Sequence, residues 1–194
     1  TVETILKSEY KNIEIIVIND GSTDNSDSKM KKLVGEWKRE TKNTPNSISL
    51  KYFYKENGGK GRALNYGLTK AKGDLIISID ADCSLTPQSI GNFVKPFADP
   101  SVCAAVGNVK IGNLDTVVGV VQYLEFLFSF YFKKAESVMG TIYIIGGAAG
   151  AFRRELFDEL GKYNHSNITE DIELSVRIQH AGRKVVYVDD ALVY

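Results

Sequence analysis

The sequence predicts an α/β domain in which a mostly parallel sheet is flanked by helices. Runs of β-branched and aliphatic residues at 13–18, 50–54 and 75–79 alternate with stretches in which apolar residues recur at helical spacing. This alternation is typical of parallel strands joined by right-handed crossovers. The run at 75–79 is almost continuously apolar, as expected of a central strand that is buried on both faces.

The composition supports one globular domain over residues 1–194. A chain of this length can bury a core of its own. Its 24 basic and 24 acidic side chains cancel, which argues against a broadly basic face and therefore against nucleic acid as a partner. Cys83 and Cys103 lack the spacing of metal ligands, and we expect them to be reduced thiols.

In the first half of the chain we expect three strands with helices between them. In order, these are a strand at 13–18, a polar turn at 19–24, a helix at 29–39, a loop at 41–49, a strand at 50–54, a glycine-rich turn at 57–62, a helix from 63 that ends at 72–73, and the strand at 75–79.

The second half is expected to hold more helix. In order, we expect a helix that begins at Thr86-Pro87, a strand at 102–111, one long or two shorter helices at 114–138, a small-residue bend at 146–150, a helix at 154–160, a helix opened by residues 168–171 with Leu174, Ile178 and Ala181 on one stripe, and a strand at 184–188.

Two carboxylates follow the central strand. Asp80 and Asp82 are separated by one residue at the point where the strand at 75–79 opens into a loop. In an open α/β sheet, ligands bind beyond the carboxyl ends of the strands. Two carboxylates together with substrate phosphates make a typical Mg²⁺ site. The alternative is a solvated Asp-rich turn, and an isolated Asp-x-Asp favours that alternative.

The turn at 57–62 combines flexibility with positive charge. Gly58, Gly59 and Gly61 would let the backbone approach a phosphate closely, where Lys60 and Arg62 supply cations. A plain turn with solvated basic side chains is the competing interpretation.

Four segments in this order resemble the family 2 glycosyltransferases, which have the GT-A fold. The segments are NDGSTD at 19–24, NGGKGRALN at 57–65, DAD at 80–82 and TED at 169–171. Each is weak alone, but the ordered set is specific and extends over nearly the whole chain. The chain is most similar to processive membrane β-glycan synthases, such as those that make poly-N-acetylglucosamine, chitin and hyaluronan.

The resemblance implies a donor site built from strand ends. Asp20 would hydrogen-bond the uridine, and Lys60 would contact the donor. Asp82 would be the stronger ligand of a divalent cation, Mg²⁺ or Mn²⁺, while Asp80 would orient the ribose or share the metal. On sequence grounds alone, Asp20 could equally be a capping residue in a tight turn.

The resemblance also implies an acceptor site. Asp171 would be the catalytic base, with Glu170 beside it at the substrate and next in line for that role. Gly146 and Gly147 would meet the acceptor sugar. The alternatives are that Glu170 and Asp171 only complement a helix dipole, and that the two glycines serve close packing.

The function implied is inverting transfer of a sugar, N-acetylglucosamine as the first choice, from a UDP-sugar donor to a growing β-linked glycan acceptor. One alternative is a non-processive transferase with a lipid acceptor. Another is a catalytically silent sugar-nucleotide-binding domain, against which the intact Asp82 and Asp171 argue. A dinucleotide-binding dehydrogenase is disfavoured, because no Gly-x-Gly-x-x-Gly follows the first strand.

We expect the chain to be a soluble fragment of a longer protein that acts at the cytoplasmic face of the cell membrane. It begins at Thr1 as if inside a helix. The family's Pro-x-Tyr-Asn-Glu and Gln-x-x-Arg-Trp segments and its transmembrane helices would lie outside it.

The apolar stretch at 117–132 is too short to span a membrane. It reads either as a core helix or as a surface helix against the membrane leaflet or the membrane helices. Its many rings favour the surface helix, and such a patch would favour self-association.

Overall fold

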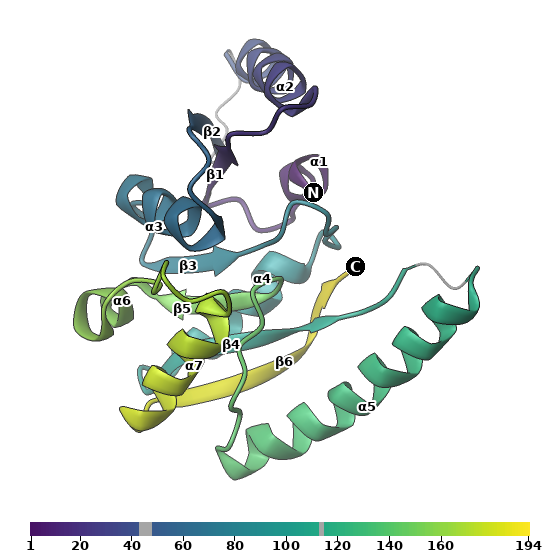
Figure 1. Ribbon diagram of the computed structural model, residues 1–194, viewed down its shortest axis with the longest axis vertical. Coiled ribbons are helices and arrows are strands. Elements are labelled where there is room, and N and C mark those ends of the chain that lie inside the picture. Colours follow the sequence, from purple (N-terminus) through teal and green to yellow (C-terminus); the bar gives the residue numbers. More distant parts are fainter. Residues whose placement is uncertain (43–47, 113–114) are drawn as a thin grey trace.

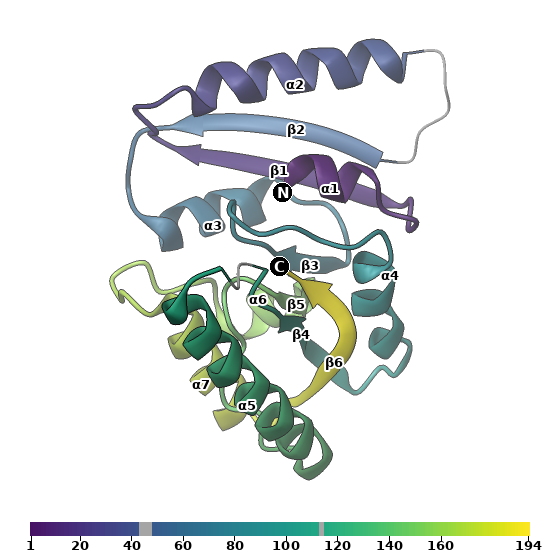
Figure 2. The same ribbon diagram turned by 90° about the vertical axis from the view of Figure 1, so that its right-hand side faces the viewer.

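Two sheets surrounded by helices make up the computed structural model, which describes residues 1–42, 48–112 and 115–194 (Figures 1 and 2). In the smaller sheet, β1 (Ile13–Asp20) pairs in parallel with β2 (Ile48–Lys55). The larger sheet has the order β3-β5-β4-β6, and its strands are β3 (Leu75–Ser78), β5 (Gly150–Arg153), β4 (Val102–Val109) and β6 (Lys184–Val193).

The larger sheet is mixed rather than mostly parallel, because β5 lies antiparallel between β3 and β4. Phe152 of β5 is in register with Ile76 on one side and with Ala104 on the other, whereas β4 and β6 are parallel. The α/β class is therefore confirmed with an added central strand. In the sequence this strand is only four residues long and follows the small-residue bend, so it lacks the pattern of an independent strand.

Helices occupy the remaining segments. They are α1 (Val2–Leu6), α2 (Ser26–Glu40), α3 (Lys60–Lys70), α4 (Ser89–Val94) with the 3₁₀ turn η1 (Lys95–Ala98), α5 (Val117–Met139), α6 (Arg154–Leu160) and α7 (Glu170–His180). In Figure 1, α2 lies over the small sheet and packs against β2, while α3 packs against β1 on the side of β3.

Several element boundaries differ from the expectations. Helix α3 begins at Lys60, so this lysine belongs to the first helical turn, and Gly59 precedes it with a positive φ of 87° that suits glycine. The expected helix start at Thr86-Pro87 is wrong, because α4 begins at Ser89. Residues 43–47 of the expected loop at 41–49, and residues 113–114 at the start of the expected long helix, lie outside the described residues.

The core lies on both faces of the larger sheet. Phe93 of α4 packs on one face, and Leu174 and Ile178 of α7 pack on the other; none is more than 1 % exposed. Full burial of such side chains stabilises the fold by about 1.5–3 kcal/mol each. The expected stripe on α7 ends at Ile178, since Ala181 is exposed beyond the end of the helix.

Helix α5 is one continuous helix that runs alongside β6 (Figure 1). Of its residues, only Gly119 is buried, while Val117, Phe128 and Phe132 are at least 66 % exposed. The expected surface position of 117–132 is thus confirmed. In the ranges that the structure describes, no helix combines the length and the apolar character needed to cross a membrane.

Candidate active site

An ion pair joins two of the residues singled out in the sequence. The Nζ of Lys60, in the first turn of α3, lies 2.8 Å from Oδ1 of Asp80, two residues beyond β3. Burial lowers the pKa of Lys60. The hydrogen bond and charge of Asp80, with the charges of Glu170 and Asp171, outweigh burial and raise that pKa. The lysine is therefore a cation held among three carboxylates.

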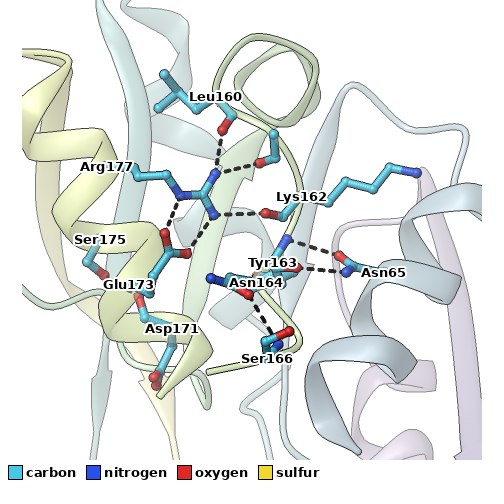
Figure 3. A network of polar contacts seen from close by, with 11 residues as sticks. Asn65, Leu160, Lys162, Tyr163, Asn164, Ser166, Asp171, Glu173, Ser175 and Arg177 are labelled. Carbon is cyan, nitrogen blue, oxygen red and sulfur yellow. Dashed lines mark hydrogen bonds and ion pairs between the residues drawn. The ribbon is translucent and has the colours of Figure 1, made fainter. Parts of the chain in front are cut away.

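The carboxylate of Asp171 is held by two backbone N–H groups, one from its neighbour in α7 and one from the distant residue Gly147. The backbone N–H of Gly147 donates to its Oδ2 at 3.0 Å, and the N–H of Ile172 donates to its Oδ1 at 2.8 Å. In Figure 3 its carboxylate points away from the other labelled side chains of α7. Ser175 also ties α7 to the segment before Gly147, because its hydroxyl donates to the Asp171 carbonyl and accepts from the N–H of Ile145.

The present positions of these groups leave little room for a side chain at position 147. A Cβ atom there would lie 2.9 Å from Nζ of Lys60 and 3.3 Å from Oδ2 of Asp171. A Cβ at Gly146 would meet nothing within 4 Å. Close packing therefore accounts for Gly147 and does not account for Gly146.

Five of the predicted residues line one cavity of about 290 Å³. They are Lys60, Asp80, Gly146, Gly147 and Asp171. The other side of the cavity is built by residues that sequence reasoning missed: Asn108, Phe126, Ser129, Phe130, Lys133 and Tyr187 are among them. The available signal was the helical spacing of 126, 129, 130 and 133, which puts these four on one face of α5.

Asp20 is not among the residues that line this cavity, and it is bonded to the glycine-rich loop. Its carboxylate accepts from the N–H groups of Gly58 at 3.0 Å and Gly59 at 2.8 Å, and it pairs with Lys55. Burial raises the pKa of Asp20, but these hydrogen bonds and the lysine charge outweigh burial, so the pKa is lowered. The residue holds the loop that leads into α3.

Asp82 is exposed and is not among the residues that line the cavity. The Sγ of Cys83 lies 3.8 Å from its Oδ1. In the described part of the chain, no three His, Cys, Asp or Glu side chains gather as a group that could hold a metal ion. Asp80 and Asp82 could thus supply two carboxylate ligands, and phosphate oxygens or water would have to supply the rest, which is a common arrangement for Mg²⁺.

Glu170 is buried, at 5 % exposure, rather than open to the cavity. Its charge helps to raise the pKa of Lys60. Burial raises the pKa of Tyr163 far above its ordinary range, and the charges of Glu170 and Asp171 act in the same direction. The charge of Glu170 therefore raises the pKa of Lys60 and of Tyr163, although its side chain does not line the cavity.

A polar network supports the start of α7 (Figure 3). Arg177 donates to both carboxylate oxygens of Glu173 at 2.8 Å and to the carbonyls of Gly161 at 3.0 Å and Lys162 at 2.8 Å. Asn65 of α3 exchanges two hydrogen bonds with the backbone of Tyr163, at 2.8 and 3.0 Å. The network ties α3, which carries Lys60, to α7, which carries Asp171.

Comparison with known proteins gives consistent relatives. The family model described as "Glycosyl transferase family 2" matches residues 1–161. A poly-beta-1,6-N-acetyl-D-glucosamine synthase of Staphylococcus aureus (strain COL) is 28% identical over 189 residues, which cover 96% of this chain and 43% of the relative. The synthase of the same name from Staphylococcus epidermidis is 28% identical over 197 residues, covering 100% and 45%. The chain thus spans less than half the length of these relatives.

Two solved structures share the fold. One is the mannosyltransferase PcManGT of Pyrobaculum calidifontis in complex with GDP-Man and Mn²⁺, with a TM-score of 0.77, 24% identity, and coverage of 99% of this chain and 50% of the other. The other is GalNAc-T7 with UDP, GalNAc and Mn²⁺, with a TM-score of 0.70, 20% identity, and coverage of 100% and 40%. These matches confirm the expected GT-A architecture.

Proposed function

The chain belongs to glycosyl transferase family 2, and from this membership we propose that it transfers N-acetylglucosamine from a UDP-sugar to a growing β-linked polysaccharide. The observation that carries the proposal is the convergence of Lys60, Asp80, Gly147 and Asp171 on one cavity from four separate segments. The choice of sugar rests on the similarity to the staphylococcal synthases.

Asp171 is the proposed general base. It lines the cavity in the first turn of α7, and the Gly147 amide fixes one of its oxygens. A carboxylate so held can take the proton from an acceptor hydroxyl as that hydroxyl attacks the anomeric carbon. Attack from the face opposite the leaving group inverts the configuration and needs no covalent sugar–enzyme intermediate.

Asp82 and Asp80 are the proposed ligands of a divalent cation, Mg²⁺ or Mn²⁺. Two neighbouring carboxylates are hard oxygen donors suited to either ion, and Asp82 is exposed and so accessible. When bound, such an ion offsets the charge on a departing diphosphate. Lys60, paired with Asp80, brings a second positive charge to the same place.

The remaining donor and acceptor contacts are proposals of the same kind. The Asp20 carboxylate accepts four hydrogen bonds, from Lys55, Gly58 and Gly59, which match its four lone-pair sites. A bond to uridine would therefore replace one of them, and the longest is the 3.3 Å bond from the Gly58 N–H to Oδ2. Glu170 would act on the substrate through the charge of Lys60. Gly146, which leaves open space, and Gly147 would border the acceptor sugar.

We further propose that the chain is the catalytic domain of a longer protein at the cytoplasmic face of the cell membrane. The exposed apolar side chains of α5 support this, because a patch of that kind on a single chain marks an interaction surface. The same helix lines the cavity, and this juxtaposition also favours a second candidate function, the non-processive glycosylation of a lipid acceptor.

Calorimetric titration of the chain with UDP-N-acetylglucosamine in Mn²⁺ tests the donor assignment, with GDP-mannose as the competitor. We expect the uridine donor to bind more tightly and to raise the unfolding temperature more, because a ligand of the folded state stabilises it by mass action. Tighter binding of GDP-mannose would contradict the uridine role of Asp20. It would instead favour GDP-mannose as the donor, the nucleotide-sugar bound in the mannosyltransferase complex.

A further inference from the structure

The α5 side of the cavity has no part in the mechanism described above. Phe126, Ser129, Phe130 and Lys133 line the cavity from this helix, and each is partly buried. On the outer face of the same helix, Phe128 is 66 % exposed. The stripe of α5 that faces the protein therefore serves as a cavity wall.

This wall is held in place by contacts with β6. The Oγ of Ser137 accepts from the N–H of Tyr187 at 2.9 Å, and Nζ of Lys134 lies 2.7 Å from Asp189. The rings of Phe130 and Tyr187 meet edge to face, with their centroids 6.0 Å apart. These contacts fix the wall against β6.

Lys133 is the unusual member of the wall. Its ammonium group makes no hydrogen bond or ion pair with any residue in the ranges 1–42, 48–112 and 115–194. Burial lowers its pKa, partly opposed by the charge of Glu136. A polar group withdrawn from water without a partner costs free energy, and an oxygen atom of a ligand would remove that cost.

The two lysines of the cavity have different surroundings. The charges of Asp80 and Asp171 act on Lys60, whereas the charge that acts on Lys133 is that of Glu136 on its own helix. Lys133 is thus a second cation of the cavity, contributed by α5 and not by the segments that carry Asp80 and Asp171. Phe130 and Tyr187 line the same cavity, and rings combined with hydrogen-bond donors suit a sugar, which has an apolar face and hydroxyl edges.

We propose that Lys133 is an acceptor-binding residue, which donates to a hydroxyl or amide oxygen of the glycan while Phe130 and Tyr187 contact the apolar face of the sugar. Ser129 adds a second hydrogen-bonding group on the same wall. The inference rests on the proposed function, since it takes the cavity to be the place where a glycan meets Asp171.

The test measures, by NMR titration and without nucleotide, how tightly the chain binds a short β-1,6-linked N-acetylglucosamine oligomer. Lys133→Met keeps the length of the side chain and removes its donor, and we expect the oligomer affinity to fall about tenfold or more, as for a lost hydrogen bond to a charged group. Lys38→Met removes the same charge from an exposed side chain of α2, which does not line the cavity. It should leave the affinity within about twofold, because surface substitutions away from a binding contact have small effects.

A second pair of variants guards against a folding artefact. Phe130→Leu should weaken oligomer binding, and Phe128→Leu, on the exposed face, should not. An unchanged affinity in folded Lys133→Met, an equal loss in Lys38→Met, or no oligomer binding by the unaltered chain overturns the inference. UDP binding in Mn²⁺, measured separately, shows whether the proposed function itself fails.

Discussion

Gly147 and Asp171 are joined by a hydrogen bond of 3.0 Å from the glycine N–H to Oδ2 of the aspartate, although they are 24 residues apart. The same glycine leaves room for the ammonium group of Lys60. One backbone position therefore sets the distance between the proposed base and the proposed donor-binding cation.

Gly147→Ala should lower the free energy of unfolding by about 1 kcal/mol. The added Cβ would lie 2.9 Å from Nζ of Lys60, so the lysine must move and its ion pair with Asp80 is weakened. Urea denaturation measures the change. Gly146→Ala is the matched control, because its Cβ would meet nothing within 4 Å. Equal losses in the two variants would mean that the contact with Lys60 is not the cause.

Asp171→Asn should lower the turnover of the complete enzyme steeply and leave the donor affinity nearly unchanged. A base acts on the acceptor hydroxyl in the transition state, and its removal typically costs about a hundred- to ten-thousand-fold in rate. An asparagine oxygen can still accept from the Gly147 N–H, which limits any structural change. The measurement is radiolabelled polymer formation by membranes that carry the complete protein. If more than about a tenth of the turnover remains, the loss is smaller than that range. Asp171 is then not the base, and Glu170 becomes the next candidate.

Asp82→Asn should abolish the Mn²⁺-dependent part of UDP binding while the fold persists. A neutral amide is a poorer ligand for a hard cation than a carboxylate. Calorimetry with and without Mn²⁺ measures the effect. Asp158→Asn, on the exposed surface of α6, is the control for loss of one negative charge. Unchanged metal-linked affinity in folded Asp82→Asn would remove this residue from the proposed metal site.

The stability contributed by Asp20 should depend on pH. Its folded-state pKa is lowered below the ordinary 3.8, so the unfolded chain takes up the proton first as the solution is acidified. The contribution is therefore complete above the unfolded pKa, and it is lost as the pH falls through the lower, folded value. Urea unfolding should show the unaltered chain more stable than Asp20→Asn at neutral pH, and the difference should shrink on acidification below about 4. A difference that is constant across this range would mean that the ionised carboxylate is not what stabilises the loop at Gly58 and Gly59.

The elements with strong local patterns were predictable from the sequence. Helix α6 has the expected bounds, 154–160, and Leu174 and Ile178 lie on the buried face of α7 as their spacing indicates. The strand end before Asp80 and the start of α7 at Glu170 follow from the same local signals. Periodicity and capping depend on residues close together in the chain, so they can be read without the fold.

The contacts between distant segments depend on the tertiary structure. Strand β5 exists because β3 and β4 provide partners on both sides of Gly150, Ala151 and Phe152, and no local pattern marks it. The rotation of α5 about its axis, which turns Lys133 toward the cavity and Phe128 outward, is set by contacts with β6 such as Tyr187 with Ser137. The residue types and their order in the chain predict the candidate chemistry, a base, a cation and two carboxylates. Their convergence depends on pairing and packing between residues far apart in the chain, which local propensity does not encode.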